Sequence, residues 1–194
     1  MPTETTNVLI CGTGGQGILL ASEIVSAAAM LSGMDVRKSE VHGMAQRGGS
    51  VVSQVRFGKA VYSPIIEEGT ADLMIALEKL EALRWSHFLS GSGTALVCDL
   101  VIEPSSVSTG QAAYPDVEAG LAARGVRSVS IDAFGEAGRL GDLRVVNTLM
   151  VGAASAHLGL PDSCWLDAMK ELLPEKALEI NTRAFLRGRE LAGA

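Results

Sequence analysis

The sequence predicts a three-layer α/β/α domain with a mostly parallel, mixed sheet that begins in the manner of a Rossmann fold. Three observations lead to this class. Short apolar runs alternate with longer segments of helical periodicity along the chain. The first apolar run, 7–11, ends in glycines and leads directly into a helical segment. An alternating stretch at 50–57 runs into a tight turn, which inserts a β-hairpin and makes the sheet mixed.

The strands are expected where short apolar runs end at turn-forming residues. The run ADLMIAL is apolar on both faces, as in a strand covered by helices on each side. Gly58-Lys59 is placed to form a tight turn from the alternating strand into AVYS, so we expect an antiparallel hairpin there. The expected strands lie at 7–11, 35–40, 50–57, 71–77, 93–100 and 127–133.

The helices are expected where apolar residues recur with a helical period. Residues 18–33 are rich in Ala and Leu, are apolar on more than one face and stop at a glycine, which indicates a buried helix. A loop rich in Ser and Pro, 103–116, interrupts the alternation of strands and helices. The other expected helices lie at 78–89, 116–125, 147–160, 162–173 and 174–191.

Length and charge limit the class of protein. A chain of 194 residues, 47% of them hydrophobic, can form one domain, 1–194, with a sizeable core. Its 16 basic residues are scattered among 22 acidic ones, and the net charge of −6 disfavours nucleic acid and membrane surfaces as partners. The N-terminus resembles no signal peptide, and no apolar run is long enough for a membrane span. We expect a cytoplasmic protein.

Three cysteines, Cys11, Cys98 and Cys164, lie far apart in the sequence. Without a C-x-x-C pair or a Cys/His cluster, the chain alone has no spacing for a disulfide framework, a structural zinc site or an iron–sulfur cluster. Cys11 and Cys98 fall within apolar, strand-like runs. We expect them to be small, buried core residues.

The stretch GTGGQG, Gly12 to Gly17, follows the first strand, opens the first helix and matches the pattern G-x-G-x-x-G. In this pattern Gly12 allows the tight turn, Gly14 lets a ligand or a backbone come close, and Gly17 lets helix and strand pack tightly. Free N–H groups at the helix start would favour an anion. Gln16-Gly17-Ile18 stands where G-K-[ST] would be required, which excludes a nucleotide-hydrolysing P-loop.

Three interpretations of this glycine turn stay open: an NAD or FAD site, a site for another phosphate-bearing ligand, and glycines used for packing alone. A dinucleotide site requires an acidic residue at the end of the second strand, about twenty residues on, to bind a ribose hydroxyl. Asp35 has this spacing but begins the strand. Glu40 has the position but comes late, in a loop.

The stretch SEVHGMAQRGGSVVSQVRFG, 39–58, carries many reactive side chains for a connector. Its loop would leave the carboxyl end of the second strand beside the glycine turn, at the edge where open α/β sheets bind ligands. Arg47 would pair a phosphate or carboxylate there, while Glu40 and His42 would hydrogen-bond or transfer protons. Alternatively, Arg47 and Glu40 form a surface pair, or the loop docks another chain. The candidate residues are Glu40, His42, Gln46, Arg47, Gly48 and Gly49.

The remaining polar candidates favour structural roles. His87 and His157 fall in expected helices. Asn147 stands where a helix begins and is expected to be its N-cap or a near-cap. The pair Glu67-Glu68 lies in a connector and is expected to be solvated.

Six stretches together carry a resemblance that covers about nine-tenths of the chain. They are GTGGQGILLAS, SEVHGMAQRGGSVVSQVRFG, VYSPIIEEGTADLMIALEKLEALR, Tyr114-Pro115, NTLMVGAAS and PEKALEIN. In this order they resemble the gamma-type subunit of 2-oxoacid:ferredoxin oxidoreductases. The MAQRGGSV form and the EKLEALR helix are most similar to the indolepyruvate ferredoxin oxidoreductase beta subunit.

The resemblance implies a heteromeric enzyme. A large alpha subunit would carry thiamine diphosphate and [4Fe-4S] clusters, decarboxylate an arylpyruvate oxidatively to an acyl-CoA with coenzyme A as co-substrate, and pass electrons to ferredoxin. This chain would bind none of these cofactors alone and would not be active alone. An interface left bare in the isolated chain would allow homodimers.

The resemblance assigns no catalytic residue to this chain, so its site residues are a hypothesis. The turn Gly12–Gly17 and the loop Glu40–Gly49 would face the alpha subunit and enclose the substrate or the CoA phosphates. Arg47 would anchor the anion, and the backbone of Gly14, Gly15 and Gln16 would donate hydrogen bonds. Two alternatives stay open, a stand-alone NAD- or FAD-binding oxidoreductase and a purely structural scaffold subunit.

Overall fold

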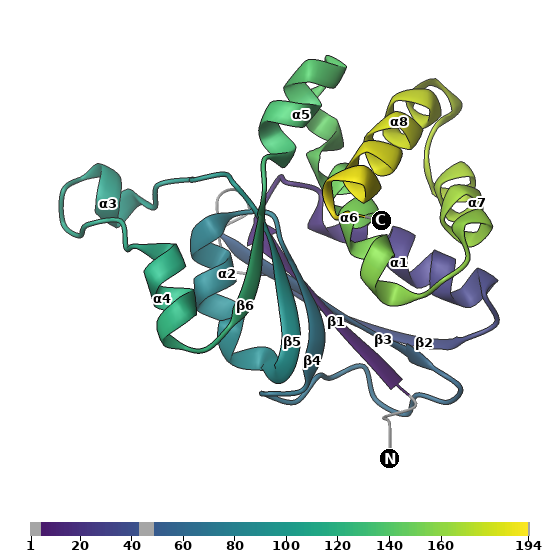
Figure 1. Ribbon diagram of the computed structural model, residues 1–194, viewed down its shortest axis with the longest axis horizontal. Coiled ribbons are helices and arrows are strands. Elements are labelled where there is room, and N and C mark those ends of the chain that lie inside the picture. The colour runs from purple at the N-terminus through teal and green to yellow at the C-terminus, as the bar shows by residue number, and fades with distance from the viewer. Residues whose placement is uncertain (1–4, 43–48, 194) are drawn as a thin grey trace.

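The computed structural model describes residues 5–42 and 49–193, without the side chain of His42. One sheet of six strands, in the order β2-β3-β1-β4-β5-β6, lies between two layers of helices (Figure 1). The predicted three-layer α/β/α class is confirmed. No helix in the described part of the chain is long and apolar enough to cross a membrane.

Five of the six strands run in the same direction. Strands β1, β4, β5 and β6 pair in parallel, whereas β3 is antiparallel to both of its neighbours, β1 and β2. The sheet is therefore mixed and mostly parallel, as predicted. The strands are β1 Thr5–Thr13, β2 Asp35–His42, β3 Ser50–Gly58, β4 Ala71–Ala76, β5 Leu89–Cys98 and β6 Arg127–Ile131.

The predicted hairpin turn at Gly58-Lys59 is wrong. The segment after Gly58 forms no strand; the N–H of Val61 donates instead to the Asp35 carboxylate over 2.8 Å. The physical reason is that β3 already pairs with β2 on one side and β1 on the other, so no edge of β3 is left for a further strand. The antiparallel pairing was correctly expected but joins β2 and β3.

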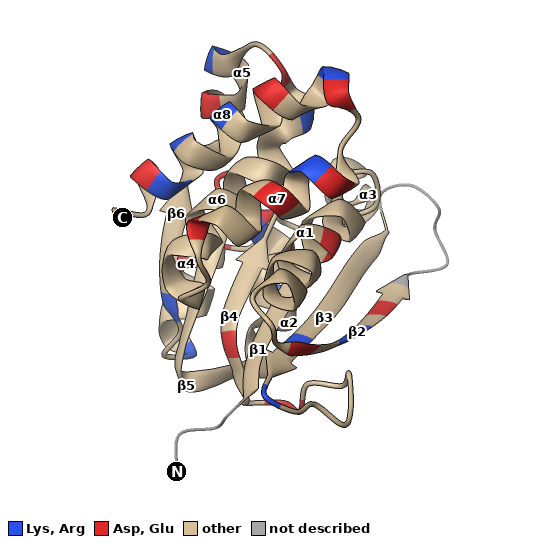
Figure 2. Cartoon of the chain, turned by 90° about the vertical axis from the view of Figure 1, so that its right-hand side faces the viewer, with Lys and Arg blue, Asp and Glu red and all other residues tan. Residues whose placement is uncertain are grey.

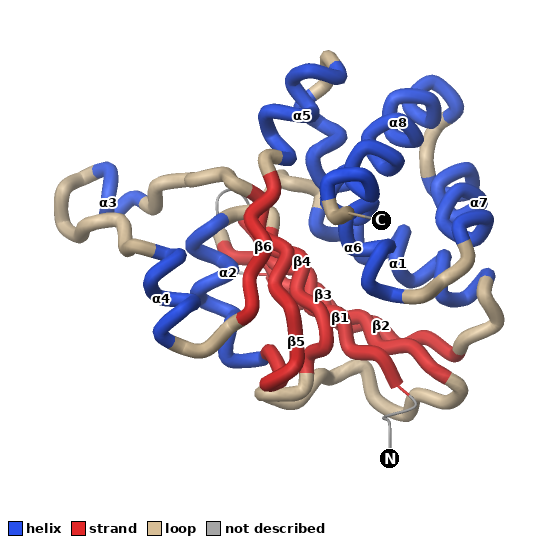
Figure 3. Tube along the Cα trace, in the orientation of Figure 1, coloured by secondary structure: helices blue, strands red, loops and turns tan. Residues whose placement is uncertain are grey.

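The helices divide between the two faces of the sheet (Figure 3). Helices α2 and α4 cover one face. Helices α1 and α6 cover the other, and α5, α7 and α8 pack against these two. The helices are α1 Ile18–Leu31, α2 Lys79–Trp85, α3 Ser105–Ser108, α4 Val117–Ala123, α5 Ala133–Leu140, α6 Val146–Leu158, α7 Asp162–Leu172 and α8 Glu175–Leu191, with short 3-10 turns η1 Ser86–Phe88 and η2 Leu143–Val145.

Helix α5 is absent from the predicted elements. It is short and contains two glycines, which weaken its helical pattern. The side chain of Asp132 accepts a hydrogen bond from the N–H of Gly135 and caps the helix at its start. This cap directly follows β6, so the helix begins at the carboxyl edge of the sheet.

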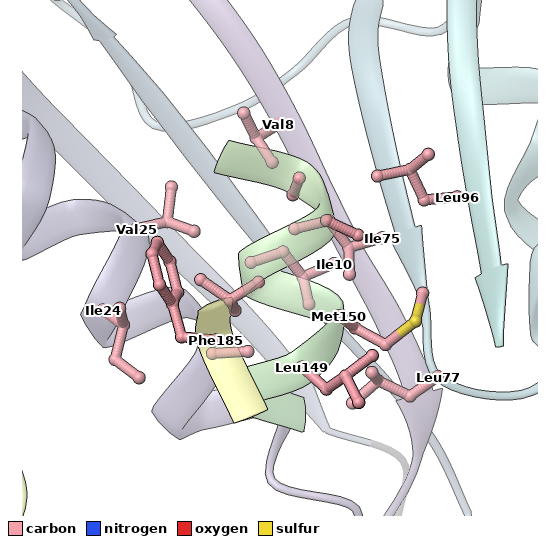
Figure 4. Packing of buried hydrophobic residues seen from close by; sticks show 14 of the residues in the cluster. Val8, Ile10, Ile24, Val25, Ile75, Leu77, Leu96, Leu149, Met150 and Phe185 are labelled. Carbon is pink, nitrogen blue, oxygen red and sulfur yellow. The ribbon is translucent and has the colours of Figure 1, made fainter. Parts of the chain in front are cut away.

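The core consists of two hydrophobic clusters, one on each face of the sheet. Alternate residues of β1 belong to opposite clusters. Val8 and Ile10 pack toward α1 and α6 (Figure 4), whereas Leu9 and Cys11 pack toward α2 on the other face. This two-sided burial explains why the central strands are continuously apolar. Cys11 and Cys98 are both buried, as predicted.

Charged side chains lie mainly on the outer surfaces of the helices. Figure 2 shows both signs interspersed along α5, α7 and α8. Arg187 of α8, for example, pairs with Glu136 of α5 over 2.8 Å and also with Glu190. The pair between Arg187 and Glu136 therefore joins α8 to α5.

Candidate functional site

A cleft of about 370 Å³ opens at the carboxyl edge of the sheet, between the start of α1 and the start of α6. Its walls come from five separate segments: the glycine turn, α1, Leu100 just after β5, α5 and the η2–α6 junction. The lining residues are Gly15, Gln16, Gly17, Leu20, Leu100, Phe134, Leu143, Arg144, Val146 and Asn147.

The glycine turn forms one wall of this cleft. Gly15 and Gly17 have φ angles of 101° and 81°, a conformation that side chains with a Cβ rarely adopt. Gly12 lies inside β1, not in the turn itself. A Cβ there would lie 2.7 Å from the Gln16 side-chain oxygen, so a larger residue would displace the Gln16 side chain.

The side chain of Gln16 folds back over the turn. Its oxygen accepts a hydrogen bond from the N–H of Thr13 over 2.6 Å, and its amide nitrogen donates to the carbonyl of Leu77 over 2.8 Å. Leu77 follows β4, so Gln16 bridges the carboxyl ends of β1 and β4. In a doubly wound sheet this crevice is the usual ligand position. Here a side chain of the protein fills part of it.

Two of the predicted backbone donors are engaged within the chain. The N–H of Gly14 donates to the carbonyl of Gly49 over 2.9 Å, and the N–H of Gln16 donates to the carbonyl of Thr13 over 3.2 Å. A ligand would therefore compete with internal hydrogen bonds at these two positions. Gly15, which lines the cleft, is the third member of the predicted set.

The bond from Gly14 to Gly49 also locates the second predicted segment. It places Gly49, the residue before β3, beside the glycine turn, in agreement with the register of Thr13 opposite Ser50. The side chain of His42 and residues Gln46, Arg47 and Gly48 lie outside the described residues. Their predicted roles stay predictions.

Glu40 is engaged on β2, where its carboxylate pairs with Lys38 over 2.8 Å. Lys38 also contacts Glu23 of α1. Glu40 is thus held in an ion-pair cluster on the strand itself. The prediction that placed Glu40 in a loop is wrong, because β2 extends to His42.

A dinucleotide site is disfavoured by the strand order. The pattern requires the second strand to lie beside the first, but β3 separates β1 from β2. Asp35 pairs in register with Gly58, at the amino edge of the sheet and away from the glycine turn. Its carboxylate accepts a hydrogen bond from the N–H of Val61, and this bond lowers the pKa of Asp35.

Asn147 joins the cleft in a role that the sequence did not predict. It is the second residue of α6, after Val146, so it is a near-cap and not the N-cap. Its side-chain amide donates to the carbonyl of Gly17 over 3.2 Å. The start of α6 is therefore linked directly to the glycine turn.

Arg144 and Phe134 are also functional candidates that the sequence reasoning missed. Arg144 projects from η2 with its side chain 89% exposed and forms a fork with Asp142, whose pKa its guanidinium lowers to about 2. Phe134 comes from the unpredicted helix α5. The cleft thus combines apolar walls with an exposed arginine at the rim, and an anionic ligand with an apolar part would share this arginine with Asp142.

Two buried carboxylates lie beside the cleft, at the start of α2. Glu78 is 1% exposed and accepts hydrogen bonds from the N–H of Ile102 and the hydroxyl of Tyr114. Glu81 is 3% exposed and accepts from Trp85 and from Ser50, the first residue of β3. Their signal in the sequence is the EKLE stretch, whose helical pattern alone does not indicate buried carboxylates.

The other residues predicted to be structural lie at exposed positions. His157 lies near the end of α6, and His87 lies in η1 rather than in the α-helix. Glu67 and Glu68 are exposed, as expected. Within residues 5–42 and 49–193, no three His, Cys, Asp or Glu side chains come together to hold a metal ion.

Comparison with known proteins agrees with this architecture. Residues 7–191 match the family model described as pyruvate ferredoxin/flavodoxin oxidoreductase. An indolepyruvate oxidoreductase subunit IorB from Thermococcus kodakarensis is 38% identical over 193 residues, which cover 94% of this chain and 93% of that protein.

Solved structures show the same fold. The gamma subunit of a keto/oxoacid ferredoxin oxidoreductase from Geobacter sulfurreducens superposes with a TM-score of 0.73 at 24% identity, covering 96% of this chain and 98% of that one. The 2-oxoglutarate:ferredoxin oxidoreductase from Magnetococcus marinus, solved with 2-oxoglutarate, coenzyme A and succinyl-CoA bound, gives 0.78 at 19% identity. It matches 98% of this chain but only 31% of that longer one. The chain belongs to the pyruvate ferredoxin/flavodoxin oxidoreductase family.

Proposed function

We propose that this chain is the small subunit of a cytoplasmic 2-oxoacid ferredoxin oxidoreductase that acts on indolepyruvate or a related arylpyruvate. The observation that carries the proposal is the 38% identity to an indolepyruvate oxidoreductase subunit over nearly the whole of both chains. In the proposed complex, the 2-oxoacid and CoA are converted to acyl-CoA and CO₂, and two electrons pass to ferredoxin.

The cofactors of this reaction would belong to a large partner subunit. Thiamine diphosphate supplies the decarboxylation chemistry and iron–sulfur clusters carry the electrons. The cysteines of this chain do not fit a cluster, because Cys11 and Cys98 are buried on opposite faces of the sheet. The longer Magnetococcus chain supports such a partnership, since this fold there forms part of a larger polypeptide.

Within the complex, the cleft at the carboxyl edge would face the large subunit and enclose part of the substrate or of CoA. The start of α1 and the exposed Arg144 would favour a carboxylate or phosphate, and Leu20, Leu100 and Phe134 would contact an apolar group. The sequence adds Arg47 as a further anion anchor from the neighbouring loop. The chain's own residues would thus bind and orient ligands and exclude water.

The test is co-expression with the large subunit, followed by an assay of viologen reduction that depends on both indolepyruvate and CoA. Because each arginine would pair an anion, we expect Arg47→Ala and Arg144→Ala to raise the KM for CoA or the 2-oxoacid about tenfold without preventing assembly. Arg127→Ala is the control, since this exposed arginine begins β6 at the opposite edge. If both substituted complexes are active and neither KM differs from the wild-type value, the two arginines do not anchor an anion.

Two alternatives give different results in a thermal shift experiment. A stand-alone oxidoreductase would be stabilised by NAD or FAD, whereas a scaffold subunit would respond to no ligand, alone or in the complex. The position of β3 between β1 and β2 argues against the first alternative. CoA protection of the complex would argue against the second.

A further inference from the structure

Three consecutive residues after β4, Leu77 to Lys79, are bonded to both sides of the cleft or lie between those that are. Leu77 accepts a hydrogen bond from the Gln16 side chain over 2.8 Å, which fixes the glycine turn. The N–H of Lys79 donates to the carbonyl of Leu100 over 3.0 Å, which fixes the opposite wall. Strand β4 lies between β1 and β5, so the segment that leaves it reaches both walls at once.

Glu78 is the central residue of this segment, and its carboxylate is almost completely buried. One oxygen accepts from the N–H of Ile102 over 3.1 Å and from the Tyr114 hydroxyl over 2.9 Å. The other accepts from the N–H of Glu81 over 2.9 Å and so caps α2. All three donors are uncharged, so burying this carboxylate is costly unless each bond is kept.

The donors show what Glu78 holds in place. Ile102 and Tyr114 are the two ends of a long, largely exposed connection that includes α3 and projects from the body of the domain (Figure 1). Leu100, two residues before Ile102, lines the cleft. Val101 and Ile102 are 47% and 37% exposed, so an apolar surface continues from the cleft onto this connection.

We propose that Glu78 is a positioning residue for the cleft, which holds Leu100–Ile102 in place as the wall opposite the glycine turn. This inference rests on the proposed function, because it assumes that the cleft receives the 2-oxoacid or CoA. It assigns Glu78 no contact with the reacting atoms. Its contribution is to fix the position of the cleft wall that the bound ligand contacts.

The test uses Glu78→Gln in the co-expressed complex. The substitution keeps the shape of the side chain, but its NH₂ group replaces one of the two oxygens. It then faces either the N–H of Glu81, so that the α2 cap is lost, or the N–H of Ile102 and the Tyr114 hydroxyl, so that the bonds accepted from the connection are lost. We expect the KM for indolepyruvate or CoA to rise about tenfold while kcat changes less than about twofold, because the wall binds but does not react. Tyr114→Phe removes one donor alone and is expected to raise the same KM by a smaller factor.

Asn7→Ala is the matched control. Asn7 is buried at the amino edge of the same sheet, where it accepts from Arg56 and donates to the carbonyl of Thr70. Its loss should lower stability without changing either KM. Hydrogen–deuterium exchange gives a second measurement: Glu78→Gln should increase exchange across 100–114 and leave α6 and α8 unchanged.

The outcomes separate this inference from the proposed function. If the wild-type complex reduces viologen but both Glu78→Gln and Tyr114→Phe keep wild-type KM values, Glu78 positions nothing and the proposed function stands. If Asn7→Ala changes the KM values as much as Glu78→Gln does, Glu78 contributes to stability only and does not position the cleft. If the wild-type complex shows no 2-oxoacid-dependent activity, the proposed function fails, and unchanged exchange across 100–114 would then overturn the positioning role itself.

Discussion

The side-chain amide of Asn147 donates a hydrogen bond to the carbonyl of Gly17 over 3.2 Å and ties the start of α6 to the start of α1. The approach is so close that a Cβ on Gly17 would lie 2.4 Å from the Asn147 amide nitrogen. Gly17 also has a φ angle of 81°. Two independent features therefore require glycine at this position.

Substitution of Gly17 should separate these two features. We expect Gly17→Ala to cost about 2–4 kcal/mol of unfolding free energy, because it adds a clash to the strained φ. Gly15→Ala is the control: its φ is 101°, but nothing lies within 4 Å of the added Cβ, so only the strain of about 1–2 kcal/mol applies. Urea unfolding measures both. Equal losses for the two variants would show that the Asn147 contact adapts without cost.

The contact between α6 and α8 depends on a pair of glycines. A Cβ on Gly188 would lie 1.9 Å from the carbonyl oxygen of Leu149, and one on Gly152 would lie 2.0 Å from that of Phe185. Because backbone atoms cannot move aside as a flexible side chain does, we expect Gly188→Ala to destabilise the fold by about 3 kcal/mol or more.

The control for this helix contact is Gly138→Ala in α5. The nearest atom to its added Cβ is a Leu143 methyl at 3.8 Å, an ordinary contact. This variant should gain up to about 1 kcal/mol from the better helix propensity of alanine. Thermal or urea unfolding of the two variants side by side checks the contrast. A Gly188→Ala protein as stable as wild type would contradict the close packing of α6 and α8.

The three thiols should differ in reactivity. Cys11 and Cys98 are fully buried, whereas Cys164 on α7 is half-buried. We expect one thiol of the native protein to react with Ellman's reagent at pH 8, and all three to react in denaturant. Cys164→Ala should abolish the native reaction. Rapid reaction of two or more native thiols would show that the core opens readily.

Stability should fall at alkaline pH because the buried thiols resist ionisation. Burial raises the pKa of Cys98 to about 12, and burial, with the nearby Glu81 and Glu78, also raises the pKa of Cys11. A raised folded-state pKa stabilises the protein fully below the unfolded value of about 8.5, and this stabilisation is lost as the pH rises toward the folded value. Each thiol would contribute a slope of up to about 1.4 kcal/mol per pH unit.

Urea unfolding between pH 8 and pH 10.5 measures this slope. Cys98→Ala should make the decline shallower, because one ionisation that favours the unfolded state is removed. A decline as steep in this variant as in the wild type would mean that Cys98 does not contribute. The comparison needs only the slope, so a small stability cost of the substitution itself does not affect it.

The sequence alone determined the features that have a local signature. The alternation of apolar strands and helices predicted the α/β/α layers, because a strand buried on both faces must be apolar throughout. The glycine turn after β1 was visible because its pattern is local. The burial of Cys11 and Cys98 followed from their places in apolar runs. The glycines of α5 weakened its pattern, and that helix, with the cleft residue Phe134, was missed.

The tertiary structure alone decided how these pieces meet. The pairing of β3 with both β1 and β2 set the strand order and moved Asp35 to the far edge of the sheet. Gln16 bonds to a residue 61 positions away, and Asn147 to one 130 positions away. Such hydrogen bonds leave no periodic trace in the sequence, because each partner is an ordinary polar or backbone group until folding brings the two together.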